Sequence, residues 1–247
     1  VAVHGLGANP AYAWVQLNSP DGQGHAEVPF NWLKELLPAE LSCRVMAFNY
    51  DSKWFWDAPQ QRPSNISDDL LRSLRDNRMN EKAVVSSLSR SAYKDIGDST
   101  VGFVFFGTPH RGSLAATLGS LIASLPLPGS INERRILRVL EEQSDTLADL
   151  LGQFSDWLFE NSVPAVCCFE KHMTAAPIVG KHMRSIKQLV VSQDSACIDG
   201  HPRIGLDADH SKMNKFYGRN DPSFQLVYPE IVRMSTSAQE MLTRRRN

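Results

Sequence analysis

The stretch VGFVFFGTPHRGS, residues 101–113, is the part of this sequence that decides the fold class. Residues 101–106 form a continuous apolar run that is rich in β-branched and aromatic side chains. Such a run is typical of a strand that is buried on both faces of a parallel sheet. Gly107, Thr108 and Pro109 follow it and are residues that end strands and form turns. We therefore expect a buried strand over residues 101–106 whose carboxyl end opens into a loop.

Further strand-like and helix-like segments alternate on both sides of this stretch. Strands are predicted over residues 1–3, 44–50, 164–169, 189–191 and 204–206. Helices are predicted over residues 30–41, 66–75 (capped by Asn65 or Ser67), 81–93, 114–161 (broken at 126–129) and 224–242. This alternation predicts an α/β fold with a mostly parallel sheet flanked by helices, in a single domain over residues 1–247. Functional residues of such a sheet collect at the carboxyl ends of its strands.

The overall charge gives no reason to expect a nucleic-acid partner. The 247 residues include 26 lysines and arginines against 27 aspartates and glutamates, so no strong basic field arises. The basic run at residues 244–246 is explained equally well as a solvated helix end. No apolar run approaches the ~18 residues that a membrane span needs. Because Val1 already lies in a strand-like run, we expect that structure is missing upstream.

The four cysteines show no redox or metal motif, and two of them indicate buried thiols. Cys43, Cys167, Cys168 and Cys197 show no C-x-x-C spacing. Cys167 and Cys168 lie inside an apolar run, so reduced thiols in an intracellular protein are expected. The histidines likewise show no H-x-x-x-H or H-E-x-x-H spacing, and we predict no metal site and no cofactor.

Candidate functional residues follow several of the predicted strands. The loop His4, Gly5, Leu6, Gly7 follows the first strand, and its glycines let backbone N–H groups turn toward an oxyanion; a plain tight turn is the alternative. His110 follows the strand at 101–106, where a structural role is more common than a role as base. For the loop and for His110 alike, the sequence position leaves a functional and a structural interpretation open.

Two further candidates follow the later strands. Glu170 comes directly after residues 164–169 and could orient a histidine or simply be the first solvated residue. His210 lies between a predicted short strand and a predicted helix, as a late general base would. Asp209 precedes His210 directly and is badly placed to reach its ring, so we prefer Glu170 as the orienting acid.

These segments together resemble a known family. It is the lipase-like serine esterase domain of fungal NACHT and ankyrin-repeat proteins, which is related to the serine active site-containing protein and to the GPI inositol-deacylase lipases. The matching segments are VAVHGLGANP (1–10), NWLKELLPAEL (31–41), RVMAFNYDS (44–52), VGFVFFGTPHRGSLAA (101–116), VPAVCCFEKHMT (163–174) and SQDSACIDGHPRIGLDADHSKMNKFYG (192–218).

The resemblance implies an α/β-hydrolase fold with a serine–acid–histidine triad that acts on the ester bonds of lipids. It places His210 as the base, Glu170 as the acid and the backbone of Leu6 in the oxyanion hole. It also implies a NACHT or ankyrin-repeat region following the domain, and peripheral membrane contact. With no signal peptide, we expect an intracellular protein, either cytoplasmic or peripheral at mitochondrial or endoplasmic reticulum membranes.

The sequence departs from this family at the catalytic serine. The family has an apolar strand and a G-x-S-x-G elbow before its equivalent of residues 101–106, but residues 70–78 (LLRSLRDNR) run straight into 79–85. No G-x-S-x-G occurs in the chain, and Gly97–Gly102 has the wrong spacing. The elbow serine is the nucleophile and its neighbour's N–H completes the oxyanion hole. Substitutes at strand ends are Ser113, Ser192 and Ser195, none of them on a strand–turn–helix junction.

Loss of the elbow strand, which is central in this fold, has a structural consequence. Its two neighbours would be left with unpaired backbone groups, at a cost of about 1–3 kcal/mol for each buried group. We therefore predict that the strand before His4 pairs directly with residues 101–106. Three interpretations stay open: an incomplete product of an esterase gene, a pseudohydrolase that serves as a binding or signalling module, or an active enzyme with a different nucleophile.

Overall fold

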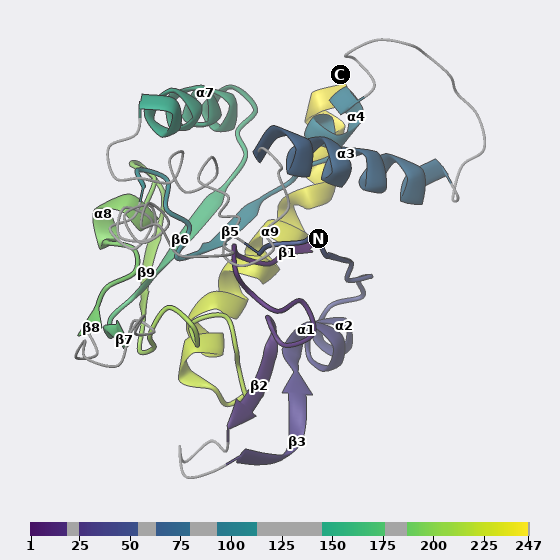
Figure 1. Ribbon diagram of the computed structural model, residues 1–247. Coiled ribbons are helices and arrows are strands. Elements are labelled where there is room, and N and C mark those ends of the chain that lie inside the picture. Colours follow the sequence, from purple (N-terminus) through teal and green to yellow (C-terminus); the bar gives the residue numbers. More distant parts are fainter. Residues whose placement is uncertain (19–24, 54–62, 80–92, 113–144, 176–186, 247) are drawn as a thin grey trace.

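Short parallel strands carry the fold in the computed structural model, which describes residues 1–18, 25–53, 63–79, 93–112, 145–175 and 187–246 (Figure 1). In one parallel sheet the order is β5-β6-β9, formed by β5 (Phe103–Phe106), β6 (Ala165–Glu170) and β9 (Arg203–Leu206). A second parallel pair joins β1 (Ala2–Val3) to β4 (Ala47–Phe48). Two antiparallel pairs join β2 (Val15–Asn18) to β3 (His25–Asn31) and β7 (Thr174–Ala175) to β8 (Lys187–Gln188).

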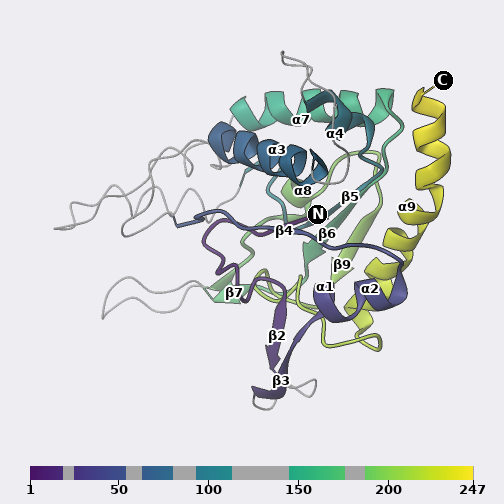
Figure 2. The same ribbon diagram turned by 90° about the vertical axis from the view of Figure 1, so that its right-hand side faces the viewer.

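Helices lie on both sides of the β5-β6-β9 sheet, so the fold is α/β. In Figure 2, α9 runs along one side of this sheet while α7 and α8 lie on the other. The helices of the described residues are α1 (Trp32–Glu35), α2 (Leu37–Glu40), α3 (Pro63–Met79), α4 (Lys94–Asp98), α7 (Asp145–Glu160), α8 (Gln193–Ala196) and α9 (Pro222–Arg246).

The two faces of the sheet bury separate apolar clusters because successive strand residues point to opposite faces. Val104 and Phe106 of β5 pack toward the cluster that contains residues of α9, whereas Phe103 and Phe105 pack toward the cluster beneath α7. The adjacent Cys167 and Cys168 of β6 divide between the clusters in the same way. The prediction of buried thiols at these two positions is confirmed, because both are fully buried and free.

The main predicted elements are present with adjusted bounds. The strand expected over 101–106 is β5, that over 164–169 is β6, that over 204–206 is β9, and the helix over 224–242 lies within α9. The predicted strand 44–50 is reduced to β4, and the strand expected over 189–191 is absent, since β8 ends at Gln188. The last part of the helical stretch expected over 114–161 is α7, and residues 114–144 of that stretch lie outside the described residues. The helix expected over 81–93 also lies outside them, except for Tyr93.

Two predictions about helix ends were wrong. The helix expected over 30–41 is two short helices preceded by a strand, because the Asn31 side chain caps α1 by accepting a hydrogen bond from the Lys34 N–H, and Pro38 stands in the first turn of α2. Asn65 and Ser67 do not cap a helix, because α3 already begins at Pro63. Residues 76–79 belong to α3, so they form no strand.

The predicted pairing between the first strand and residues 101–106 was also wrong. Within the described residues, β1 pairs with β4 and β5 pairs with β6, and no ladder joins β1 to β5. The two strands both contribute side chains to one apolar cluster, Ala2 from β1 and Val104 and Phe106 from β5. They are linked through this cluster and not through the backbone hydrogen bonds of a ladder, which need strands about 4.8 Å apart. The side chain of Val3 is correspondingly exposed, and all four residues of β5 are partly exposed.

Candidate functional site

The structure brings Glu170 and His210 together at the carboxyl end of the β5-β6-β9 sheet. Glu170 is the last residue of β6, and His210 follows β9 by four residues. Because β6 and β9 are adjacent and parallel, with Glu170 opposite Leu206 in the register, their ends open into neighbouring loops. The Oε2 atom of Glu170 lies 3.7 Å from Nδ1 of His210.

Glu170 is a buried carboxylate that is held by hydrogen bonds. Its side chain has no exposed surface, and its Oε1 atom accepts a hydrogen bond of 2.8 Å from the backbone N–H of Val191. Burial raises the pKa of Glu170, while hydrogen bonds from the N–H groups of Val191 and Val190 and from the Thr174 hydroxyl act in the opposite direction. The side chain is therefore not the first solvated residue after the strand but an internal group with a fixed orientation.

His210 is an imidazole at the edge of the interior. Burial lowers its pKa, and the charge of Asp209 opposes that shift. Its Nδ1 atom is buried and has no hydrogen-bond partner within the described residues, since 3.7 Å to Glu170 exceeds normal hydrogen-bond length. Catalytic hydrogen bonds are often this long in unliganded proteins. Among the described residues, the Glu170 carboxylate is the acidic group that lies within 4 Å of Nδ1, and an approach to hydrogen-bond length would complete the bond.

The loop after β5 packs against the imidazole of His210 at Gly107. Gly107 has φ of +57°, and its N–H donates a hydrogen bond of 2.9 Å to the carbonyl of Cys168. An added Cβ at this position would lie 2.8 Å from Cε1 of His210. Only glycine therefore fits here without moving the imidazole.

The carboxylate of Asp209 is bound by other neighbours. Its Oδ1 atom accepts hydrogen bonds from the N–H and hydroxyl of Ser211, and Oδ2 lies 3.5 Å from the Lys212 ammonium. These contacts occupy both carboxylate oxygens. Between the two candidate acids, only Glu170 has an oxygen within 4 Å of the imidazole nitrogen.

The loop of residues 4–7 packs against the segment that follows β4. The His4 ring is buried and stacks on Tyr50 at 4.5 Å, and the Gly7 N–H donates a hydrogen bond of 2.7 Å to the carbonyl of Ser52. The Gly7 N–H is thus occupied, whereas the Leu6 N–H makes no hydrogen bond to the described part of the chain. No hydrogen bond or ion pair within that part joins this loop to Glu170 or His210.

His110 has the surroundings of a structural residue. Its ring meets Phe105 edge-on at 4.7 Å, its backbone N–H donates to the carbonyl of Ser195, and burial together with the charge of Arg111 lowers its pKa to about 4. An imidazole with so low a pKa is a weak base at neutral pH.

The alternative serine nucleophiles are either occupied or undescribed. The Ser195 hydroxyl donates to the carbonyl of Gly112 and accepts from the N–H of Arg111. Ser192 caps α8 by accepting from the Ser195 N–H. Ser113 lies outside the described residues. Neither described serine has a contact with His210, so neither forms the nucleophile–base pair that acyl transfer needs.

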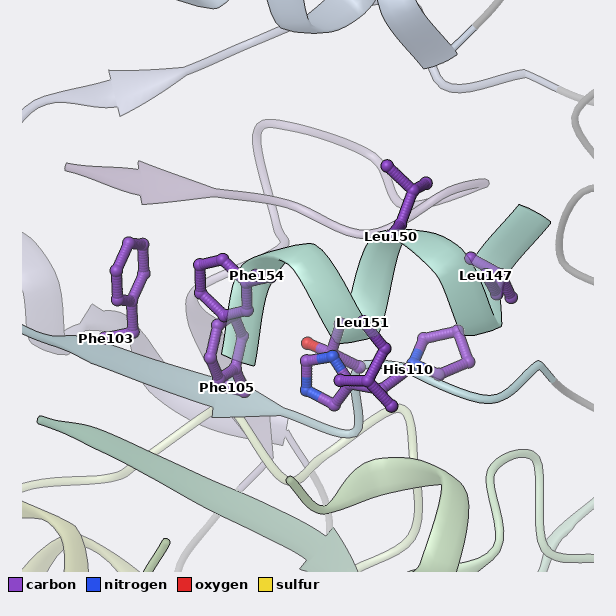
Figure 3. Close-up of a pocket in the computed structure, with 9 residues that line it drawn as sticks. Phe103, Phe105, His110, Leu147, Leu150, Leu151 and Phe154 are labelled. Atoms are coloured by element: carbon purple, nitrogen blue, oxygen red, sulfur yellow. The ribbon is translucent and has the colours of Figure 1, made fainter. Parts of the chain in front are cut away.

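An apolar pocket of about 350 Å³ lies between β5 and α7 (Figure 3). It begins at the loop after Gly107, and Figure 3 shows His110 in its middle, beside Leu151. This size lies within the usual range for small-molecule sites. The pocket is lined by Phe103, Phe105, Thr108, Pro109, His110, Leu147, Leu150, Leu151 and Phe154.

The remaining polar groups suggest no second centre in the described ranges. The Nε2 atom of His172 lies 2.5 Å from Oδ1 of Asp207, and both side chains are largely exposed. Across those ranges, no group of three or more histidine, cysteine, aspartate or glutamate side chains could hold a metal ion. Among the described helices, none is both long and apolar enough to cross a membrane.

Two residues of this site were not anticipated from the sequence. Thr174 contacts both Glu170 and His210, and Gly107 supports the imidazole. The turn after β5 was predicted, but nothing in the sequence pattern indicates which strand-end loops meet. Comparison with known proteins adds no assignment, because no family, no curated protein and no solved structure matches the chain.

Proposed function

We propose that this chain is the acid–base half of a serine ester hydrolase site of the α/β-hydrolase type, without the nucleophile. The observation that carries the proposal is the buried carboxylate of Glu170 facing Nδ1 of His210 at the ends of adjacent parallel strands. A carboxylate at Nδ1 fixes the imidazole in the tautomer that leaves Nε2 free to take a proton. The motif resemblance, whose segments are spread along nearly the whole chain, supports the same interpretation.

The roles of the individual groups follow from their positions. His210 would take the proton of a hydroxyl at Nε2 and return it to the leaving group, while Glu170 would stabilise the imidazolium that forms in between. The unbonded N–H of Leu6 would supply half of an oxyanion hole. The nucleophile itself has no candidate among the described serines that contacts His210, so the chain as it stands is proposed to be inactive.

A second candidate function is a binding module. The apolar pocket between β5 and α7 favours it, because this pocket exists without any contribution from a nucleophile (Figure 3). A pseudohydrolase that has lost turnover can retain such a pocket as a ligand site. On this proposal the protein would bind a small apolar group without changing it.

Labelling with a fluorophosphonate probe tests whether the chain lacks an activated serine. The expected result is no labelling of the purified protein, either as it is or after His210→Ala. Labelling that disappears in the His210→Ala variant, but persists in a control such as His172→Ala, would show an active enzyme with another nucleophile. That outcome would contradict the proposal of an incomplete site.

A further inference from the structure

The Thr174 hydroxyl lies between the two members of the acid–base pair. Its Oγ1 atom is 3.0 Å from the backbone nitrogen of His210 and accepts that hydrogen bond. The same atom is 3.5 Å from Oε2 of Glu170, to which the hydroxyl donates. A threonine hydroxyl has one proton to give and lone pairs to accept with, so both contacts can be made at once.

The oxygen that Thr174 contacts is the one that faces the imidazole. Oε2 of Glu170 lies 3.7 Å from Nδ1 of His210, whereas Oε1 is bound by the N–H of Val191. The two oxygens are thus held by different partners, and rotation of the carboxylate would break both contacts. Thr174 therefore fixes the rotation of the acid and the backbone position of the base simultaneously.

One partner of the carboxylate, Thr174, belongs to the antiparallel pair β7–β8, and another, Val191, lies on the segment that continues from β8. Thr174 is the first residue of β7 and pairs with Gln188 of β8, and Val191 follows β8 by three residues. Strand pairing holds Thr174 opposite Gln188, three residues before Val191. The β7–β8 pair consequently acts as the support of Glu170, although it contributes neither the acid nor the base.

We propose that Thr174 is a positioning residue that keeps Glu170 aimed at Nδ1 of His210, an inference that rests on the proposed acid–base pair. Replacing its hydroxyl with a methyl group leaves the His210 N–H and one lone pair of Glu170 unpaired. The imidazole then loses its preference for the tautomer with the proton on Nδ1. The side-chain volume is nearly unchanged in Thr174→Val, so packing is retained.

The test reads the tautomer of His210 directly, by nitrogen-15 NMR of the histidine rings at pH 8. The unaltered protein should show the Nδ1–H form, assigned through loss of the signal in His210→Ala. In Thr174→Val the ratio of the Nδ1–H to the Nε2–H form should fall about fivefold, which corresponds to one ordinary hydrogen bond. Thr174→Ser should restore the original ratio, and Thr236→Val, which removes an exposed hydroxyl on α9, should leave it unchanged.

The outcomes separate this inference from the proposed function. If Glu170→Gln shifts the tautomer ratio but Thr174→Val does not, the acid–base pair stands and the role of Thr174 is refuted. A Thr174→Ser variant that behaves like Thr174→Val would refute it as well, because the hydroxyl would not be the active feature. If Glu170→Gln itself leaves the ratio unchanged, the acid–base pair is refuted, and with it the proposed function. Thermal melts of all variants show whether any change comes from loss of the fold.

Discussion

Gly107 lies so close to the imidazole of His210 that an added Cβ would be 2.8 Å from Cε1 and 2.9 Å from Nδ1 of that ring. The end of β5 thereby sets the position of a residue that follows β9. The strands β5 and β9 are not adjacent, since β6 lies between them. The proposed base is supported from two strands, while its acid comes from the third.

Gly107→Ala is expected to move His210 and to destabilise the protein. The Cβ would also approach the Met213 sulfur, and φ of +57° disfavours a side chain. We expect a loss of about 1–3 kcal/mol in the free energy of unfolding, with a changed NMR signal of the His210 ring. Gly152→Ala on α7, where an added Cβ meets nothing, should instead leave stability equal or improved. Equal effects of the two substitutions would contradict the close contact.

The buried His110 predicts a dependence of stability on pH. Its pKa is about 4 in the folded protein, against an ordinary value of 6.5 for histidine, so the unfolded chain binds more protons between these values. Stability should therefore fall as the pH decreases from 6.5 to 4, by up to roughly 3 kcal/mol from this group. The raised pKa of Glu170 acts oppositely just above pH 4.5. Urea unfolding of His110→Leu should show a smaller fall over the same range; an identical pH profile would show that His110 does not titrate in this way.

Arg111 ties the loop after β5 to α8 and the turn that follows it. Its guanidinium donates to the carbonyls of Asp194 and Cys197, and it forms an ion pair with Asp199 at 2.9 Å. Lysine cannot reproduce these forked contacts, so Arg111→Lys should cost about 1–3 kcal/mol in chemical unfolding. The exposed pair between Arg233 and Glu230 supplies the comparison, because Arg233→Lys should change stability by less than about 0.5 kcal/mol.

The four thiols should differ sharply in their reactivity. Cys43 is exposed, whereas Cys167, Cys168 and Cys197 are fully buried, and burial raises the pKa of each of these three thiols. Since the thiolate is the reactive form, titration with a thiol reagent should find one fast group in the native protein and four after denaturation. Cys43→Ser should remove the fast reaction. More than one fast thiol in the native state would mean that at least one of the two apolar clusters of the sheet is open.

The sequence was sufficient for β5 and β6, because long apolar runs such as residues 101–106 and 164–169 have few other conformations in an α/β chain, whereas β9 was predicted from the short run 204–206. Glu170 and His210 could be proposed from their positions after strands. The pairing of β1 could not be predicted correctly, because an apolar run shows that a strand exists but not which neighbour it meets. Thr174 could not be found either, since its role depends on how β7 pairs with β8 and on where the loop after β9 lies.

The measurement that tests the central claim most directly is sequencing of the transcript and of the genomic DNA across the codons for Arg78 to Lys82. The proposal of an esterase site that has lost its nucleophile segment predicts that the intervening genomic sequence encodes an apolar strand and a G-x-S-x-G. Protein made from the longer reading frame should then react with a fluorophosphonate, and His210→Ala should abolish that reaction. Continuous coding sequence in both DNA and transcript would contradict the interpretation of an incomplete esterase product and would favour the binding module.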